Sequence, residues 1–117
     1  MNIYDTANKL ASEIKQSKEY IDYKELKKKI NLNPDKKQKL EEFEKLRYEI
    51  QLSSMQEDPN NEEFAKRHKQ RLEELQEKYT KLLEDEEMKK YFELELQFNV
   101  MIADINKIIA EVVKDVL

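Results

Sequence analysis

The sequence contains no cysteine, no glycine and no tryptophan, and only two prolines among its 117 residues. Without cysteine, the chain forms no disulfide, uses no catalytic thiol and holds no cysteine-ligated metal such as an iron–sulfur cluster. Without glycine, glycine-rich phosphate loops and dinucleotide fingerprints are excluded, and hairpin turns built on glycine are disfavoured. The chain is instead rich in Glu, Lys, Leu and Gln, which are strong helix formers. We therefore expect an all-α protein.

Long hydrophobic runs are also missing. No stretch of about 18 apolar residues occurs, so the sequence predicts no membrane span. The first residues, MNIYDTANKL, lack the charged-then-apolar pattern of a signal peptide. These two features predict a cytoplasmic location.

Charged residues make up 41% of the chain, with 22 basic and 26 acidic residues and a net charge of -4. This balance argues against a generally basic nucleic-acid-binding protein. Apolar residues, at 38%, must gather on narrow helix faces to offset the entropy of folding. The length is that of one domain, so we predict a single helical domain over residues 1–117.

Two proline-containing segments interrupt the helical pattern. Pro34 disfavours helix at Asn33 and suits the first position of the next helix, with Asn33 as its cap. In the second segment, QEDPNNEEF, either Asp58 or Asn60 is expected to cap a helix that starts near Pro59. The two segments therefore predict the beginnings of a third and a fourth helix. The third helix is expected to carry an apolar stripe of Leu40, Phe43, Leu46 and Ile50, with Met55 as a further candidate.

A further break is expected where the apolar stripe of the fourth helix loses its phase, with Asp85 as the cap of a fifth helix. The first helix is predicted over residues 3–16, and the second from a cap at Ser17 to about residue 30. The first is expected to carry a single apolar stripe of Ile3, Ala7, Leu10, Ala11 and Ile14. Nothing between these two forbids helix, so one bent rod stays an alternative. The fifth helix runs from about Glu86 to the C-terminus and is about 45 Å long. The expected fold is a helical bundle of about five helices with a long C-terminal helix.

The fifth helix carries more apolar residues than one face accommodates. Its broad face is expected to bury against two other helices; it consists of Tyr91, Leu94, Phe98, Met101, Ile102, Ile105, Ile108, Ile109, Val112 and Val116. Phe92, Leu96 and Val100 follow one another at four-residue intervals on the opposite side. This second side is either enclosed within the chain or meets another subunit. Because only four shorter helices are left to cover it, we favour a homodimer that associates through these three residues.

The sequence offers little catalytic or metal-binding chemistry. His68 is the only histidine, and residue 65 is alanine, so the Glu-x-x-His pair typical of metal sites in helical bundles is missing. We interpret His68 as a boundary residue between Phe64 and Leu72. The carboxylates lie beside Lys and Arg on solvated helix faces. We therefore predict no metal, no cofactor and no enzymatic activity.

A basic run contains Lys66, Arg67, Lys69 and Arg71, and these side chains could contact RNA phosphates. Equally, they could form the polar side of an amphipathic helix. No aromatic residue for base stacking alternates with them, and the acidic run at residues 84–87 offsets their charge. Binding of RNA is therefore the alternative interpretation.

Three segments together carry a resemblance to a known family. They are YDTANKLASEIKQSKEYIDY at the start, NPDKKQKLEEFEKLRYEIQ in the middle and YFELELQFNVMIADINKII near the end. The chain resembles the YlbF/YmcA-like family of small helical bacterial proteins, particularly its YheA branch. This resemblance implies an all-α, often oligomeric cytoplasmic protein of a Gram-positive bacterium.

Better-known members of that family act as non-enzymatic partners in a complex that affects competence, sporulation, biofilm formation and RNA processing. The resemblance also implies iron–sulfur clusters held by cysteines, but a chain without cysteine cannot hold them in this way. We therefore predict a non-enzymatic protein–protein interaction module, homodimeric, with a regulatory or scaffolding role. The alternative is an RNA-associated protein or an accessory factor in RNA processing.

Overall fold

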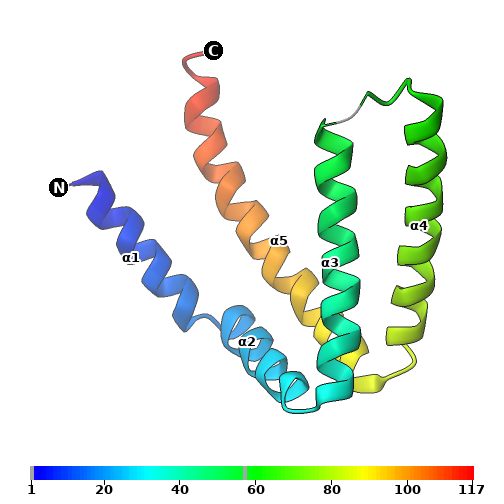
Figure 1. The fold of residues 1–117 in the computed structure, drawn as a ribbon. Helices are drawn as coiled ribbons and strands as arrows, with labels where there is room; N and C mark the ends of the chain where they lie inside the picture. The colour runs from blue at the N-terminus through cyan, green and yellow to red at the C-terminus, as the bar shows by residue number, and fades with distance from the viewer. Residues whose placement is uncertain (1, 57) are drawn as a thin grey trace. The chain divides into compact units, whose positions relative to one another are not determined.

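The computed structural model describes residues 2–56 and 58–117. Over these residues it contains five α-helices and no strand (Figure 1), which confirms the predicted all-α fold with a long C-terminal helix. The helices are α1 (Ile3–Gln16), α2 (Lys18–Asn31), α3 (Pro34–Gln56), α4 (Glu62–Leu82) and α5 (Glu86–Lys114).

Ser17 separates α1 from α2, so the first two helices are distinct and do not form one rod. Its hydroxyl donates to the carbonyl of Ile14 at 2.6 Å and accepts from the backbone N–H of Tyr20 at 3.2 Å. Asn2 caps the other end of α1, accepting from the N–H of Tyr4 at 2.8 Å. Small polar side chains thus satisfy the free backbone groups at these helix ends. No described residue has a positive φ, in keeping with a chain without glycine.

The predicted start of α3 is confirmed, whereas the predicted cap of α4 is wrong. The Asn33 side chain accepts from the N–H of Lys36 at 3.2 Å, and α3 begins at Pro34. At α4, neither Asp58 nor Asn60 is the cap; Asn61 is, and it accepts from the N–H groups of the second and third helical residues. Asp58 instead accepts from the N–H of Asn60 at 2.9 Å within the preceding turn.

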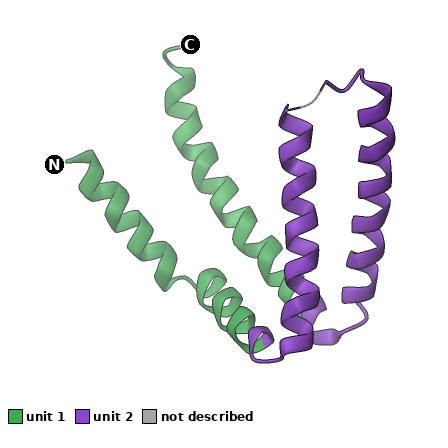
Figure 2. Ribbon diagram, in the orientation of Figure 1, with its two compact units in different colours: residues 1–29, 90–117 green, residues 30–89 purple. Residues whose placement is uncertain are grey.

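The chain forms two compact units, which are coloured separately in Figure 2. Unit 1 comprises Met1–Lys29 and Lys90–Leu117, and unit 2 comprises Ile30–Lys89. The single domain predicted from the chain length stays a prediction.

Unit 2 is built on the antiparallel hairpin of α3 and α4 (Figure 1). The stripe predicted on α3 is its core: the buried side chains there are Leu40, Phe43, Leu46 and Ile50. Phe43 stacks on Tyr79 of α4, with ring centroids 5.8 Å apart. Met55, also considered for this stripe, is 77% exposed and lies outside the core.

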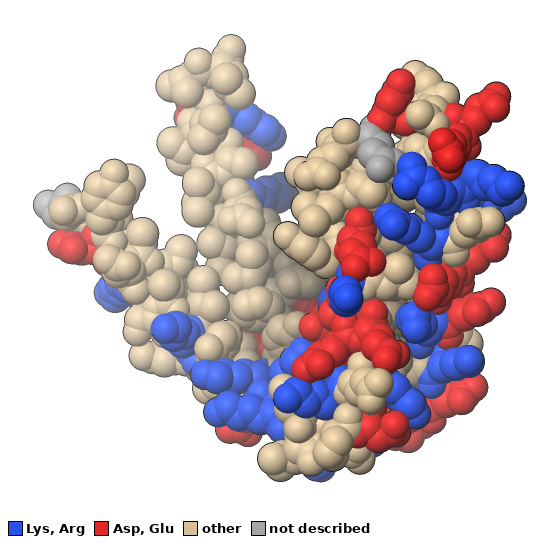
Figure 3. All heavy atoms as spheres, viewed as in Figure 1, with Lys and Arg blue, Asp and Glu red and all other residues tan. Residues whose placement is uncertain are grey.

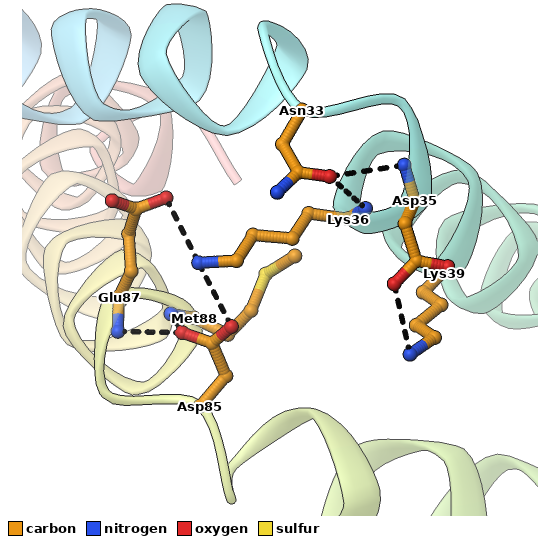
Figure 4. Close-up of polar contacts among 7 residues, drawn as sticks. All are labelled: Asn33, Asp35, Lys36, Lys39, Asp85, Glu87 and Met88. Carbon is orange, nitrogen blue, oxygen red and sulfur yellow. Dashed lines mark hydrogen bonds and ion pairs between the residues drawn. The ribbon is translucent and has the colours of Figure 1, made fainter.

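The corner between α4 and α5 is held to the start of α3 by Lys36, as Figure 4 shows. The Lys36 ammonium lies 2.9 Å from Asp85 Oδ2 and 3.4 Å from Glu87 Oε1. The predicted cap of α5 is confirmed, because Asp85 Oδ1 accepts from the N–H groups of Glu87 and Met88. The hydrogen bond from Lys36, together with these two backbone bonds, lowers the pKa of Asp85 below its ordinary 3.8. The hydrogen bond to Asp85 and the charges of both carboxylates raise the pKa of Lys36 above 10.5.

Candidate functional site

Unit 1 has an aromatic core where α2 meets the first part of α5. The ring centroid of Tyr23 lies 5.3 Å from that of Tyr91 and 5.5 Å from that of Phe98, and Tyr20 also contacts Phe98. The Tyr91 hydroxyl donates to that of Tyr23, which donates to Glu95 Oε2 at 3.1 Å. Tyr91 is only 2% exposed, and these hydrogen bonds satisfy its buried hydroxyl. The aromatic core therefore fixes α2 against α5 as far as Phe98.

Only two of the three residues of the predicted association surface are exposed in the structure. Phe92 is buried, at 8% exposure, whereas Leu96 is 64% and Val100 is 50% exposed. Each helix turn advances 3.6 residues, so Leu96 and Val100 still share a side of α5. Two exposed side chains form a smaller surface than the three expected. Whether this surface mediates association stays a prediction.

The broad face expected to be buried on α5 is buried only in its first part. Tyr91 and Leu94 are buried, and Phe98, Met101, Ile102 and Ile105 are half-buried. Beyond residue 105 the expectation is wrong, because the apolar side chains there are exposed; they are Ile108 (70%), Ile109 (54%), Val112 (69%) and Val116 (84%). The physical reason is the length of α5, which at 29 residues extends well past Phe98, where its ring contacts with Tyr20 and Tyr23 of α2 are made.

α1 has an apolar stripe that is exposed at Ile3, Ala7 and Ala11 and half-buried at Leu10 and Ile14. The predicted residues Ile3, Ala7, Leu10, Ala11 and Ile14 do lie on one face, but α1 buries none of its residues. Within unit 1, α1 and the end of α5 diverge toward the two chain ends (Figure 2). In the face shown in Figure 3 both segments carry mostly uncharged side chains. We call α1 and residues 101–116, which are the last part of α5 with the turn that follows it, the terminal arms.

The sequence interpretation missed the exposure of the terminal arms. A signal was present, because apolar residues recur three and four residues apart to the very end of α5. Such spacing shows that a helix has an apolar face, but it does not show which segment covers that face.

The basic residues proposed for RNA contact all lie in the first half of α4. Lys66, Arg67 and Lys69 are exposed, and Arg71 is half-buried. They do not form one stripe, because Lys66 and Lys69 occupy a different side of the helix from Arg67 and Arg71. Figure 3 shows basic side chains gathered over this part of α4, next to acidic ones.

His68 lies at a shallow hollow of about 360 Å³ between the end of α3 and the start of α4. Its ring stacks on Phe64, with centroids 5.3 Å apart, and its Nδ1 atom is buried without a hydrogen-bond partner. The half-buried position agrees with the interpretation of His68 as a boundary residue. Among the residues that the structure describes, no cluster of three or more His, Asp or Glu side chains is arranged to hold a metal. No described helix is both long and apolar enough to span a membrane.

The fold and these surfaces define a small all-helical protein with exposed apolar helix faces. Its sequence matches, over residues 3–114, the family model described as "Control of competence regulator ComK, YlbF/YmcA". The chain belongs to the YlbF/YmcA family, as its resemblance predicted. That description links the family to the control of a regulator, which is a regulatory role.

Several proteins named UPF0342 are similar to this chain along most of its length. One from Halothermothrix orenii is 35% identical over 109 residues, covering 93% of this chain and 86% of the relative. Another from Alkalihalophilus pseudofirmus is 33% identical over 115 residues, covering 98% and 92%. A third from Desulfitobacterium hafniense is 32% identical over 117 residues, covering 100% and 89%. No solved structure matches the chain significantly.

Proposed function

We propose that this chain is a non-enzymatic regulatory module of the cytoplasm that acts through protein–protein contacts and forms a homodimer. One observation carries the proposal: α5 exposes apolar side chains on two nearly opposite sides. Leu96 and Val100 lie on one side, and Ile109 and Val112 lie on the other.

Exposed apolar side chains on two sides support association with two different surfaces. Burying one Val, Leu or Ile side chain contributes roughly 1.5–3 kcal/mol, and contiguous exposed apolar surface is typical of interaction sites. One side of α5 would contact a second copy of the chain. The other side would contact a different protein, in keeping with a family described as controlling a regulator.

The homodimer is tested by sedimentation velocity of the purified chain from low to high micromolar concentration. We expect a species of twice the 14.2 kDa chain mass to dominate at the upper end. A monomer throughout the range would refute the homodimer.

Binding to a regulatory partner is tested by affinity capture from native cytoplasm with the wild-type chain and Leu96→Glu. Asn106→Glu is a matched control, since residue 106 is exposed and lies between the two apolar sides of α5. We expect a protein that the wild type and the control retain in stoichiometric amount, and that Leu96→Glu loses. Identical retention by all three chains would exclude Leu96 from partner binding.

An RNA-associated role is the second candidate, and the exposed positions of Lys66, Arg67 and Lys69 on α4 favour it. Acidic residues Glu62 and Glu63 lie in the first turn of α4, within four residues of Lys66, and weaken the local positive field. If the role is correct, RNA binding falls with salt and is lost in the double variant Lys66→Glu/Lys69→Glu. No mobility shift of RNA at low salt would remove this candidate.

A further inference from the structure

α1 lacks the packing that normally stabilises a helix of its length. It spans 14 residues and has a capped start, but it buries no side chain. Isolated helices of about 12–15 residues are marginal in water, and helices in proteins gain most of their stability by packing an apolar face. Its apolar residues at 3, 7, 10 and 14 alternate in steps of four and three, the spacing of a helix that packs along a neighbouring helix.

The end of α5 has the same spacing. Its seam consists of Ile102, Ile105, Ile109 and Val112, again in steps of three and four, and Val116 follows in the turn after the helix. All five are β-branched, and β-branched residues at both seam positions favour bundles of more than two helices over a two-stranded coil. The last three are at least 54% exposed. This seam is therefore suited to pack against more than one helix. Unit 1 alone leaves its last residues exposed.

We infer that the terminal arms of two copies of this chain pack together into one intermolecular four-helix bundle, with each α1 against the partner copy's α5. This inference rests on the proposed homodimer and assigns its interface to the seam side of α5. α1 and the end of α5 diverge within unit 1 (Figure 2), so the arms of a second copy would lie between them. Four helices that each present a narrow apolar stripe can form a stable bundle core.

The exposed apolar side chains of the arms supply a large part of the apolar area that such an interface needs. A Val or Ile side chain presents roughly 60–120 Å² of apolar surface, as follows from its transfer energy at about 25 cal/mol per Å². Ile3, Ile108, Ile109, Val112 and Val116 are each more than half exposed, and together offer on the order of 300 Å². The half-buried seam residues of both arms add to this. A standard interface buries about 800 Å² per partner, of which roughly 450–500 Å² is apolar. Leu96 and Val100 alone fall well short of this area.

The charges on the arms favour a second copy over a charged partner. α1 carries Asp5 and Glu13 against Lys9 and Lys15, so its charges cancel. At the end of α5, acidic and basic residues also alternate, and all of them lie away from the seam; they are Asp104, Lys107, Glu111, Lys114 and Asp115. Nucleic acid or a strongly acidic peptide would require a surface of one sign. Mixed charges beside an uncharged seam instead suit a self-complementary, symmetric contact.

The test compares charge substitutions on and off the seam in the full chain. Leu10→Glu and Val112→Glu place a carboxylate in the seam of each arm. Ser12→Glu and Lys107→Glu place it on the far side of the same helices. Because burying an unpaired charge is costly, we expect each seam variant to weaken dimerisation roughly 30-fold or more by sedimentation, and the far-side controls to leave it unchanged. Thermal unfolding of each variant reports whether unit 2 stays folded.

The outcomes separate this inference from the homodimer itself. A wild-type monomer refutes both. A wild-type dimer that Val112→Glu leaves intact but Leu96→Glu dissociates refutes the four-helix bundle and assigns the dimer to the opposite side of α5.

The pairing of α1 with the partner copy is tested by cross-linking through introduced cysteines. Because the chain has no cysteine of its own, no other thiol reacts. Ala7→Cys and Val112→Cys are introduced into two differently tagged chains, which are mixed and treated with a short bis-maleimide. We expect a cross-linked product that carries both tags, and much less of it when Ser12→Cys replaces Ala7→Cys. If the chains dimerise but give no product with both tags, the proposed arrangement of helices is wrong.

Discussion

Lys36 joins the start of α3 to the start of α5 at the corner of unit 2. Its ammonium lies between the carboxylates of Asp85 and Glu87, and the side chains of all three are between 21% and 33% exposed. Asp85 also caps α5 through two backbone hydrogen bonds. The Asp85 carboxylate thus caps α5 and also holds the start of α5 against α3. Substitutions at Asp85 can separate the contribution of its charge from that of its capping hydrogen bonds.

Asp85→Asn keeps a good helix cap but removes the charge, and Asp85→Ala removes both. At neutral pH we expect losses in the free energy of unfolding of a few tenths to about 1 kcal/mol for Asn, and about 1 kcal/mol more for Ala. Urea unfolding followed by circular dichroism measures both. Glu84→Gln, at an exposed neighbouring carboxylate, is the matched control and should change little.

The same contact predicts a pH dependence. The pKa of Asp85 in the folded chain lies below 3.8, so its contribution is present above that value and is lost as pH falls through the folded pKa. The pKa of Lys36 is raised above 10.5, so its contribution is present below that value and is lost as pH rises through the folded pKa. The difference between wild type and Asp85→Asn should therefore shrink below about pH 3.8. A constant difference from pH 7 to pH 3 would show that the charge does not stabilise the fold.

At the scale of elements, the α3–α4 hairpin of unit 2 has the core that its sequence pattern predicts. Leu40, Phe43 and Ile50 recur at helical spacing and are all at most 7% exposed. Phe43 packs on Tyr79 and also lies under the guanidinium of Arg47, 5.2 Å from the ring centroid. The hairpin therefore depends on its middle residues more than on its open end, where Met55 is exposed.

Phe43→Ala should lower the free energy of unfolding by about 3–5 kcal/mol, because it removes a buried aromatic ring and leaves a cavity. Met55→Ala, on the same helix, should cost less than about 0.5 kcal/mol. Chemical denaturation with fluorescence of the tyrosines and far-UV circular dichroism measures the two side by side. Equal effects of the two substitutions would mean that the hairpin core lies elsewhere than in the middle of α3.

At the scale of the whole molecule, unit 1 has two exposed arms, whereas unit 2 has its own buried core. If the arms fold only against a second copy, association and folding are linked, and dilution destabilises the protein. The melting temperature should then rise with chain concentration, with each tenfold increase stabilising the dimer by about 1.4 kcal/mol. Differential scanning calorimetry over a hundredfold range of concentration measures this.

Val112→Glu should abolish that dependence and leave a melting transition that does not move with concentration. In the same variant, amides of α1 should exchange hydrogen rapidly, while those of α3 and α4 keep their protection. Strong protection of α1 in a monomeric variant would show that α1 is stable without a partner copy.

The sequence by itself determined the helices, most of their starts and the family. Asn33, Ser17 and Asp85 act on backbone groups within three residues, and Pro34 acts on its immediate neighbour, so their effects are local and can be read from neighbouring letters. Asn61 was missed only because three cap-forming residues compete within one short turn.

Burial was decided by the tertiary structure. Phe92 and Leu96 lie one helical turn apart and look alike in the sequence, yet one is 8% and the other 64% exposed. The apolar stripe that is buried at Tyr91 continues along the sequence to Val116, which is 84% exposed. The helical period of the sequence shows which side of a helix is apolar. Whether another helix covers that side depends on where segments distant in the sequence lie in the folded chain.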